Sequence, residues 1–322
     1  MKININDLIG NTPIIKIKIK FNNKIKNIYA KLEYYNYTGS IKDRVAYYII
    51  NKSYENKTLK ENMPIIEATS GNTGISFSAI GSLYKHPVHI FMPDWVSIER
   101  IKLMKLYGAN VYLVSKKEGG FKEAIKRADL LAKQINGFRP NQFSNNLNTL
   151  AHYETTGKEI LDKVDNISAF VSGIGTGGTI IGTGKRIKEK FQDAEIIAVE
   201  PENMTLLSKK IKIGSHKIEG IGDDFLPDLV DKSLINEVIT ISDQEAINMT
   251  NRLARELGLG VGISSGANFL ASVLMKYDNV VTIFADDFKK YLTTDLTKEK
   301  DTKKYISDKI EFISLETFSK KE

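Results

Sequence analysis

The chain has 322 residues and not one cysteine. This absence excludes a thiol nucleophile, a thiolate-bound zinc or iron–sulfur centre, and any disulfide. Histidine is scarce as well, and its four residues lack the i, i+4 or short-loop spacing of metal ligands: His86, His89, His152 and His216. The sequence therefore disfavours a zinc hydrolase.

Long apolar runs and concentrated charge are also missing. Residues 1–10 contain no apolar run after a basic start, and glycines break the longest apolar stretches well before membrane-spanning length. The net charge is +7, but the lysines are spread along the chain. The densest basic stretch, 298–304, is interleaved with Glu299 and Asp301, which predicts a solvated tail. We expect a cytoplasmic protein with no membrane or nucleic-acid partner.

The composition is typical of a globular protein, with 42% apolar side chains, and the length suits two domains. β-branched residues alternate over 12–19 and 27–33, and strand, loop and helix patterns then repeat. Further strands are expected at 63–67, 87–92, 110–115, 168–172, 194–199, 236–241 and 279–284. Helices are expected at 40–54, 72–84, 97–107, 121–136, 148–163, 177–190, 243–257 and 266–277. This order predicts an α/β fold with largely parallel strands in two sheets, divided near the Asn-rich segment 141–148.

Ligands bind beyond the carboxyl ends of strands in open parallel sheets, so we expect the chemistry in the loops that follow strands. Loop 38–44 carries Lys42 in the first turn of an expected helix, with Ser40 as N-cap and Asp43 three residues later. The positive end of the helix dipole disfavours an ammonium there and favours the neutral amine that reacts with an aldehyde. Viewed alone, Lys42 is more typical of a surface lysine.

Loop 68–74 reads Ala-Thr-Ser-Gly-Asn-Thr-Gly and lies between an expected strand and an expected helix. Two glycines and four small hydroxyl or amide side chains at a helix N-terminus form a cradle for a carboxylate or a phosphate. The simpler alternative is a capped turn, although a cap needs one polar side chain and this loop has four.

Loop 173–179 matches the dinucleotide-binding pattern G-x-G-x-x-G, and Glu200 ends the next expected strand, where a ribose-binding acid would lie. An NAD-dependent oxidoreductase is therefore an alternative. The same loop suits a single phosphate ester, and Thr176 and Thr179 add hydroxyl donors that a pyrophosphate loop does not need. A fourth glycine-rich loop, 260–266, also enters an expected helix.

Together, the four loops resemble those of the cysteine synthase family, whose members are pyridoxal-phosphate enzymes of fold type II with the tryptophan synthase β-like fold. The resemblance covers about residues 6–296. It rests mainly on the segments 10–13, 39–44, 69–74, 141–143, 175–179, 220–222 and 262–266.

This resemblance implies pyridoxal 5'-phosphate as cofactor, with Lys42 as its covalent anchor and as the base that moves the substrate's α-proton. It implies that Asn72 contacts the ring oxygen and that Ser264 faces the pyridine nitrogen. The implied phosphate ligands are Gly175, Thr176, Gly177, Gly178 and Thr179. The implied ligands of the amino-acid substrate are Thr69, Ser70, Thr73, Gln142 and Gly220.

The reaction implied by the resemblance is β-replacement on a serine-type amino acid through an α-aminoacrylate. A hydroxyl at the pyridine nitrogen leaves it largely unprotonated, which favours loss of a β-substituent over transamination. The main expectation is that O-acetylserine and sulfide give L-cysteine and acetate. The family organisation implies a smaller mobile domain (43–147), a larger domain (1–42 plus 148–297) and a tail (298–322), with the active site between the domains. It also implies a homodimer and a serine acetyltransferase as a partner.

The chain departs from many cysteine synthases after 220–222, where small residues are replaced by Asp223, Asp224 and Phe225, and it is more similar there to cystathionine β-synthases, which have an aspartate just before the phenylalanine. We hypothesise that Asp224 lies near Cβ of the substrate and acts as a general base or assists a poor leaving group. Serine or cysteine would then serve as substrates, and cysteine and water would give serine and hydrogen sulfide, or a thiol would give cystathionine or lanthionine. The alternative is a solvated loop carboxylate.

Two further readings complete the sequence-based expectations. The segment 285–290 replaces a proline and a glycine-containing turn that relatives commonly have, which predicts altered loop geometry and no firm functional consequence. A non-catalytic, amino-acid-binding homologue is the remaining alternative, and no degraded site residue favours it.

Overall fold

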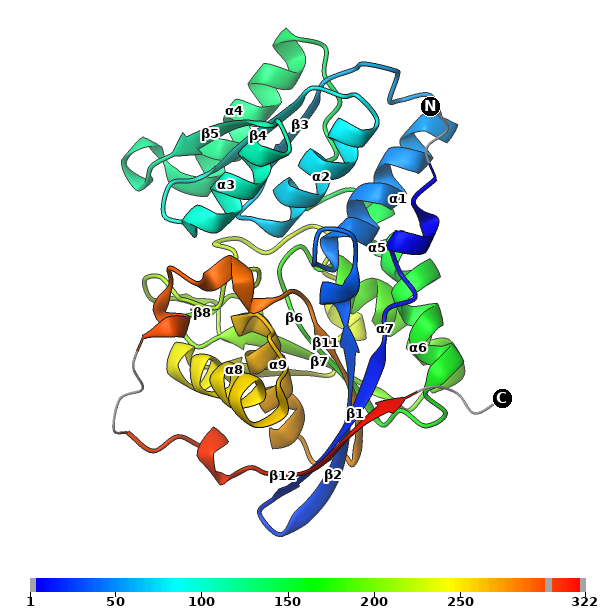
Figure 1. Ribbon diagram of the computed structural model, residues 1–322, viewed down its shortest axis with the longest axis vertical. Coiled ribbons are helices and arrows are strands. Elements are labelled where there is room, and N and C mark those ends of the chain that lie inside the picture. The colour runs from blue at the N-terminus through cyan, green and yellow to red at the C-terminus, as the bar shows by residue number, and fades with distance from the viewer. Residues whose placement is uncertain (1–3, 299–302, 319–322) are drawn as a thin grey trace.

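The computed structural model of the protein describes residues 4–298 and 303–318. The start of segment 1–10 and residues 299–302 of the basic stretch 298–304 lie outside the described residues. Figure 1 presents two α/β units along the long axis of the molecule, one built on a three-stranded sheet and the other on a seven-stranded sheet. The expectation of two sheets is confirmed.

The larger sheet has the strand order β10-β7-β6-β11-β2-β1-β12. Its strands are β10 (Glu237–Ile241), β7 (Glu195–Pro201), β6 (Ala169–Gly173), β11 (Asn279–Phe284), β2 (Lys24–Leu32), β1 (Ile14–Phe21) and β12 (Glu311–Phe318). The strands from β10 to β2 are parallel, whereas β1 pairs antiparallel with both β2 and β12. The sheet is therefore mixed, and its antiparallel part comes from the two ends of the chain.

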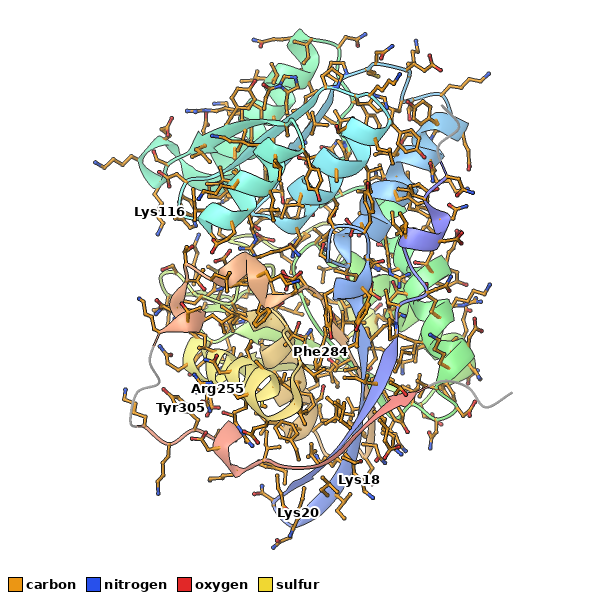
Figure 2. The ribbon with its side chains drawn as sticks, viewed as in Figure 1. Lys18, Lys20, Lys116, Arg255, Phe284 and Tyr305 are labelled. Carbon is orange, nitrogen blue, oxygen red and sulfur yellow. The ribbon has the colours of Figure 1, made fainter. Side chains whose placement is uncertain are left out.

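Helices cover both faces of the larger sheet, because successive strand residues are buried on opposite sides. Val280 of β11 packs with α8 and α9, whereas Val281 packs with α7. These helices are α5 (Asn146–Ala151), α6 (Lys158–Lys163), α7 (Gly178–Lys190), α8 (Asp243–Leu257) and α9 (Ile263–Leu274). In Figure 2, Phe284 lies inside this unit, whereas Lys18 and Lys20 lie near its outer tip.

The smaller sheet is parallel throughout, with the order β3-β4-β5. Its elements are β3 (Ile65–Ala68), β4 (Val88–Pro93), β5 (Asn110–Val114), α1 (Lys42–Glu55), α2 (Asn72–Leu83), α3 (Ile98–Leu106) and α4 (Gly120–Gln134). Ile90 packs with α1, α2 and α3, and the next residue, Phe91, packs with α4 on the opposite face. Alternate burial again explains the nearly unbroken apolar strands.

Three elements differ from the expectations. The helix expected at 148–163 is interrupted by a π-helical segment, η4 (His152–Gly157), between α5 and α6. The helix expected at 266–277 is α9, which begins earlier, at Ile263, and a small hairpin of β8 (Met204–Thr205) and β9 (Ile211–Lys212) was not expected. The strand β12 lies beyond the basic stretch 298–304, and it pairs with β1.

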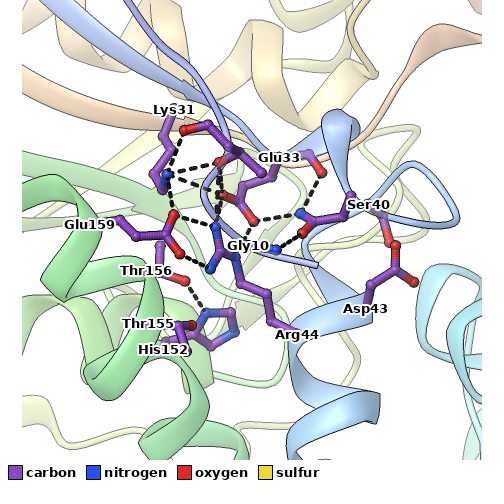
Figure 3. Close-up of polar contacts among 12 residues, drawn as sticks. Gly10, Lys31, Glu33, Ser40, Asp43, Arg44, His152, Thr155, Thr156 and Glu159 are labelled. Carbon is purple, nitrogen blue, oxygen red and sulfur yellow. Dashed lines mark hydrogen bonds and ion pairs between the residues drawn. The ribbon is translucent and has the colours of Figure 1, made fainter. Parts of the chain in front are cut away.

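A buried ionic network joins the start of α1 to the larger sheet (Figure 3). Arg44 of α1 pairs with Glu33 at 2.6 Å and with Glu159 at 2.6 Å, and Lys31 pairs with Glu159 at 2.7 Å. Burial alone would raise the pKa of Glu33, but the charges of Arg44 and Lys31 lower it to about 2. The network anchors α1 at Arg44, which lies two residues after Lys42.

No helix in residues 4–298 and 303–318 has both the length and the apolar character needed to cross a membrane. The same residues contain no cluster of three or more histidine, aspartate or glutamate side chains suited to a metal ion.

Candidate active site

One pocket at the carboxyl ends of the parallel strands is lined by nearly all the expected site residues. They are Lys42, Thr69, Ser70, Asn72, Thr73, Gln142, Gly175, Thr176, Gly177, Thr179, Gly220 and Ser264. Gly178 is the first residue of α7, directly beside this lining. Each sheet thus contributes loops from the carboxyl ends of its parallel strands, β6 and β11 in the larger sheet and β3 in the smaller one, and the pocket lies where the two sets of loops meet.

Lys42 is the first residue of α1, and its backbone N–H donates to Ser40 Oγ at 3.3 Å. The expectation of Ser40 as N-cap with Asp43 as its acidic partner is wrong: the N-cap of α1 is Ile41 without a side-chain cap bond, and Asp43 accepts hydrogen bonds from Thr38 at 2.6 and 2.7 Å. The side chain of Asp43 is thereby occupied away from the pocket, and Lys42 is left to face it.

The electrostatic surroundings of Lys42 favour a reactive amine. Burial lowers its pKa to about 8, although the carboxylates of Asp223 and Asp286 act in the opposite direction. A much larger neutral fraction is therefore present near neutral pH than for an exposed lysine, and the neutral amine is the form that attacks an aldehyde.

The second loop is held rigidly at the N-terminus of α2. The Gly71 N–H donates to Thr69 Oγ1 at 3.0 Å, and the Thr73 hydroxyl donates to Gln142 Oε1 at 2.6 Å. Gln142 in turn donates to the backbone carbonyl of Ala68 at 2.9 Å. A side chain on Gly71 would come within 2.4 Å of Arg100, so only glycine fits there. The loop and Gln142 form one unit with groups suited to an anion.

The third loop joins β6 to the N-terminus of α7. A side chain on Gly178 would collide with Asn148 at 2.0 Å, and one on Gly175 with the Gly220 carbonyl at 2.5 Å. Gly177 has a φ of +86°. Asn148 donates to Thr176 Oγ1 at 2.9 Å and so orients that hydroxyl. Free N–H groups and the helix dipole create a phosphate site at this point.

His152 supports the phosphate loop from below. Its ring lies 2.9 Å from the Thr156 hydroxyl and 3.3 Å from the Thr179 hydroxyl (Figure 3 shows the former contact). Burial lowers its pKa well below the usual value, so the imidazole is neutral and structural. The position of His152, one helical turn from Thr156, favours such a structural hydrogen bond over a catalytic role, whereas the π-helical segment that carries it is not visible from hydrophobic periodicity.

The two neighbouring aspartates occupy different places. Asp223 lines the pocket with Lys42, whereas Asp224 lines only the adjoining cavity and pairs with Lys212 at 3.1 Å. Burial, and then the charge of Asp224, raise the pKa of Asp223 to about 6. The structure therefore does not bring Asp224 to the pocket; the turn at Gly222, with a φ of +71°, brings its neighbour instead.

Two further charged residues were missed by sequence reasoning. Arg100 of α3 lines the pocket and is 1% exposed, and Asp286 is fully buried behind it. Asp286 accepts hydrogen bonds from Asn72 and from the Tyr291 hydroxyl, each at 2.7 Å. Arg100 pairs with Glu219 and stacks 4.5 Å above the Tyr291 ring. The only sequence signal was the position of Asp286 just after a buried strand.

Glu200, the acidic residue of the alternative dinucleotide site, is engaged by the loop that follows it. Both carboxylate oxygens of Glu200 accept hydrogen bonds from its own neighbourhood, from Leu207 N–H at 2.6 Å and from Ser208 at 2.9 and 3.1 Å. This arrangement leaves Glu200 holding the following loop together. The glycine-rich loop is consequently a phosphate site without the ribose partner of a nicotinamide cofactor.

Comparison with known proteins identifies the class. Residues 5–286 match the family described as pyridoxal-phosphate dependent enzyme. The chain belongs to this family. It is similar to cysteine synthase B of Campylobacter jejuni, with 44% identity covering 91% of this chain and 97% of the relative. It is also similar to a probable cysteine synthase of Bacillus subtilis, with 41% identity covering 90% and 96%.

A solved structure extends the comparison. The hydrogen sulfide-producing enzyme from Fusobacterium nucleatum superposes with a TM-score of 0.92 and 45% identity, covering 97% of this chain and 98% of that one. The protein is thus a pyridoxal-phosphate-dependent enzyme of the cysteine synthase type, with the fold that the sequence resemblance implied.

The pocket fits this cofactor on its own geometry. Glycines at 175, 177 and 178 keep side chains away from the N-terminus of α7, where a phosphate is favoured. Asn72 Oδ1 is buried without a hydrogen-bond partner among the described residues, as expected of an atom that meets a ligand. In the same pocket, the Lys42 amine suits the cofactor's aldehyde and the Ser264 hydroxyl suits its pyridine ring.

Proposed function

We propose that the enzyme replaces the acetoxy group of O-acetylserine by sulfide, which gives L-cysteine and acetate. The observation that carries this proposal is the union, in one pocket, of Lys42, the anion loop at 69–73 and the phosphate loop at 175–179. The names of the similar cysteine synthases support the choice of substrates.

Bound pyridoxal phosphate supplies the aldehyde that links to an amine and the ring that withdraws electrons from the substrate's α-carbon. We assign Lys42 as the covalent anchor and as the base for the α-proton, because burial lowers its pKa and gives it a larger neutral fraction than an exposed lysine has. We assign the substrate carboxylate to Thr69, Ser70, Thr73 and Gln142, with Gly220 on the opposite wall. The Ser264 hydroxyl would face the pyridine nitrogen and leave that nitrogen largely unprotonated.

We further propose that residues 43–147 act as a smaller mobile domain against 1–42 plus 148–297. The carboxylate loop begins α2 of the smaller sheet, whereas the phosphate loop begins α7 on the larger sheet. A substrate that bridges the two loops would draw the units together and exclude water from the pocket.

A second function is favoured by the position of Asp223. A carboxylate beside Lys42 with a pKa of about 6 is mostly ionised at neutral pH and is able to accept a proton from water or a thiol. We propose that the enzyme also converts cysteine and water to serine and hydrogen sulfide. The similar hydrogen sulfide-producing enzyme supports this activity.

The experiment for the function is a matrix of substrates. O-acetylserine, serine and cysteine are each combined with sulfide, homocysteine or water, and products are identified by mass spectrometry. Cysteine from O-acetylserine and sulfide is the expected main product. Absence of any β-replacement product from a yellow, cofactor-loaded protein would exclude the proposed function.

Asp223→Asn is expected to reduce formation of hydrogen sulfide from cysteine and water at least about 100-fold, because the base is lost. Its effect on O-acetylserine and sulfide is expected to be small, since acetate leaves readily and hydrosulfide is already a nucleophile. Wild-type activity with cysteine and water should fall as the pH drops below about 6, where Asp223 becomes protonated. Rates and products are measured as in the substrate matrix.

The matched variant is Asp224→Asn, which removes the neighbouring carboxylate that sequence analysis selected. A much smaller loss is expected, because Asp224 pairs with Lys212 outside the pocket. A larger loss of activity in Asp224→Asn than in Asp223→Asn would assign the general base to Asp224 and contradict its assignment to Asp223.

We propose a homodimer that forms through α3. Leu106 is 82% exposed and Ile98 is 42% exposed on this helix, and Leu292, which is 52% exposed, follows the segment η6 (Phe288–Tyr291) that packs against it. Single exposed apolar residues are ordinary, so the proposal takes these side chains as one apolar patch, which is the kind of surface that marks an interface. Leu106→Glu is expected to convert a dimer to monomers in sedimentation experiments. A wild-type monomer, or an unchanged dimer in the variant, would contradict this interface.

Two further proposals rest on the family resemblance alone. We propose that the enzyme works in the cytoplasm and that it binds a serine acetyltransferase. Co-elution of the two purified proteins in size-exclusion chromatography tests the second proposal.

A further inference from the structure

The buried side chain of Asp286 receives contacts from both units of the molecule. Asn72 at the start of α2 donates to its Oδ2 atom at 2.7 Å, and the Arg100 guanidinium of α3 lies 3.9 Å from the same oxygen. Tyr291, from the same segment as Asp286, also donates to Oδ2 at 2.7 Å. One carboxylate oxygen thus connects two helices of the smaller unit to the loop after β11.

Asp286 acts on the pocket from outside it. Asn72 lines the pocket and Asp286 does not. An Asn amide turned the other way would bring its carbonyl oxygen against the carboxylate, which is strongly unfavourable in a buried site. The contact therefore fixes the Asn72 side chain in one orientation, in which Oδ1 and the second amide hydrogen remain for a ligand.

The backbone around Asp286 also holds the loop of Lys42. Ile41 N–H donates to the carbonyl of Ala285 at 2.9 Å, and Ser40 forms a β-bridge with Asp286 itself. A side chain on Gly262 would come within 2.0 Å of Asp286 Oδ1, so the carboxylate packs tightly against the loop that precedes Ser264. The side chain cannot easily rotate away from Asn72 in this confined place.

We propose that Asp286 is a positioning residue for the cofactor site, which acts by fixing the amide of Asn72. This inference deepens the proposed function, since it rests on the role of Asn72 as a cofactor ligand. It assigns a role to segment 285–290, for which the sequence predicted no firm functional consequence.

The test measures cofactor affinity in the absence of any amino-acid substrate. Pyridoxal phosphate is removed from the purified holoenzyme and titrated back while the visible absorption is followed. Asp286→Ala and Asn72→Ala are each expected to weaken binding about tenfold, the effect of one lost hydrogen bond. Asp286→Asn is expected to retain most of the affinity, because its amide oxygen still accepts from Asn72.

The decisive measurement is the double variant Asn72→Ala/Asp286→Ala. If Asp286 acts through Asn72, the double variant binds the cofactor about as weakly as either single variant, roughly tenfold below wild type. A roughly hundredfold loss would mean independent effects and would overturn the proposal. Wild-type affinity in either alanine variant would overturn it as well.

Controls separate positioning from folding. Asp287→Ala removes the adjacent carboxylate, which accepts the Lys289 N–H at 2.9 Å and does not line the pocket, so affinity should stay within about twofold of wild type. Thermal unfolding of the cofactor-free proteins measures stability. Asp286→Ser, whose hydroxyl is too short to reach Asn72, is a second variant and should behave like Asp286→Ala. If neither variant folded, Asp286 would be a structural residue and the proposal would fail.

Because no amino acid is present, these results do not depend on which β-substituent the enzyme replaces. A failed substrate matrix with intact coupling between Asn72 and Asp286 would leave this inference standing. The opposite result would leave the proposed reaction standing without a role for Asp286.

Discussion

Lys42→Ala is expected to give a colourless protein whose β-replacement activity is at least about 10⁴-fold below that of the yellow wild type. Two losses combine in this variant, because the same amine is assigned as covalent anchor and as base. Its burial and its pKa of about 8 make it the amine in the pocket suited to both roles. Visible absorption and the rate of cysteine formation are the two measurements.

Borohydride supplies an independent check on the same lysine. Reduction of the wild-type protein should abolish the visible band and leave the cofactor attached to the peptide that contains Lys42. Lys52→Ala is the matched control, since Lys52 lies on the same helix but is exposed and pairs with Glu55 at 2.8 Å. A yellow Lys42→Ala variant would disprove the assignment.

Arg44→Met is expected to lower the free energy of unfolding by about 3–5 kcal/mol, because it leaves Glu33 buried without its main partner. The melting temperature should fall by roughly 10 °C for a protein of this size. Arg127→Met removes an exposed ion pair with Glu118 and should change stability very little. Thermal unfolding followed by circular dichroism measures both variants.

The pH dependence of stability is a second test of the ion pair between Glu33 and Arg44. The pKa of Glu33 is lowered from 4.5 to about 2 in the folded protein, so its stabilising contribution is complete above pH 4.5 and is lost as the pH falls toward 2. Wild-type stability should therefore decline across this range, and the decline should be smaller in Arg44→Met. Equal profiles for the two proteins would mean that Glu33 is not stabilised by Arg44.

Short-range patterns located the loops of the pocket, and the family resemblance of the four loops together gave their residues roles. Lys42, the loop at 69–73, the loop at 175–179 and Ser264 each follow a recognisable strand or begin a recognisable helix. Within each sheet the parallel strands place such loops at one edge, whereas the packing of the two sheets against each other, which no local pattern encodes, brings the loop at 69–73 to the loop at 175–179. Gln142 joined them through the family resemblance alone.

Side-chain direction in irregular segments could not be predicted in the same way. Asp223 and Asp224 are adjacent in sequence, and the backbone turn at Gly222 decides which carboxylate faces Lys42. The orientation of the Asp286 side chain depends on its contacts with Asn72 and Arg100. Both of these residues lie far earlier in the chain. No local periodicity encodes such pairings, and a buried carboxylate is indistinguishable from an exposed one in sequence.

The order of strands in the larger sheet has a consequence for synthesis on the ribosome. β3, β4 and β5 come from one continuous stretch, so the smaller sheet is able to form while translation continues. β2, by contrast, pairs with β11, and β1 pairs with β12, and both partners lie much later in the chain. The hairpin of β1 and β2 therefore exposes both of its outer edges until β11 and β12 have been made, and unpaired strand edges favour association with other chains.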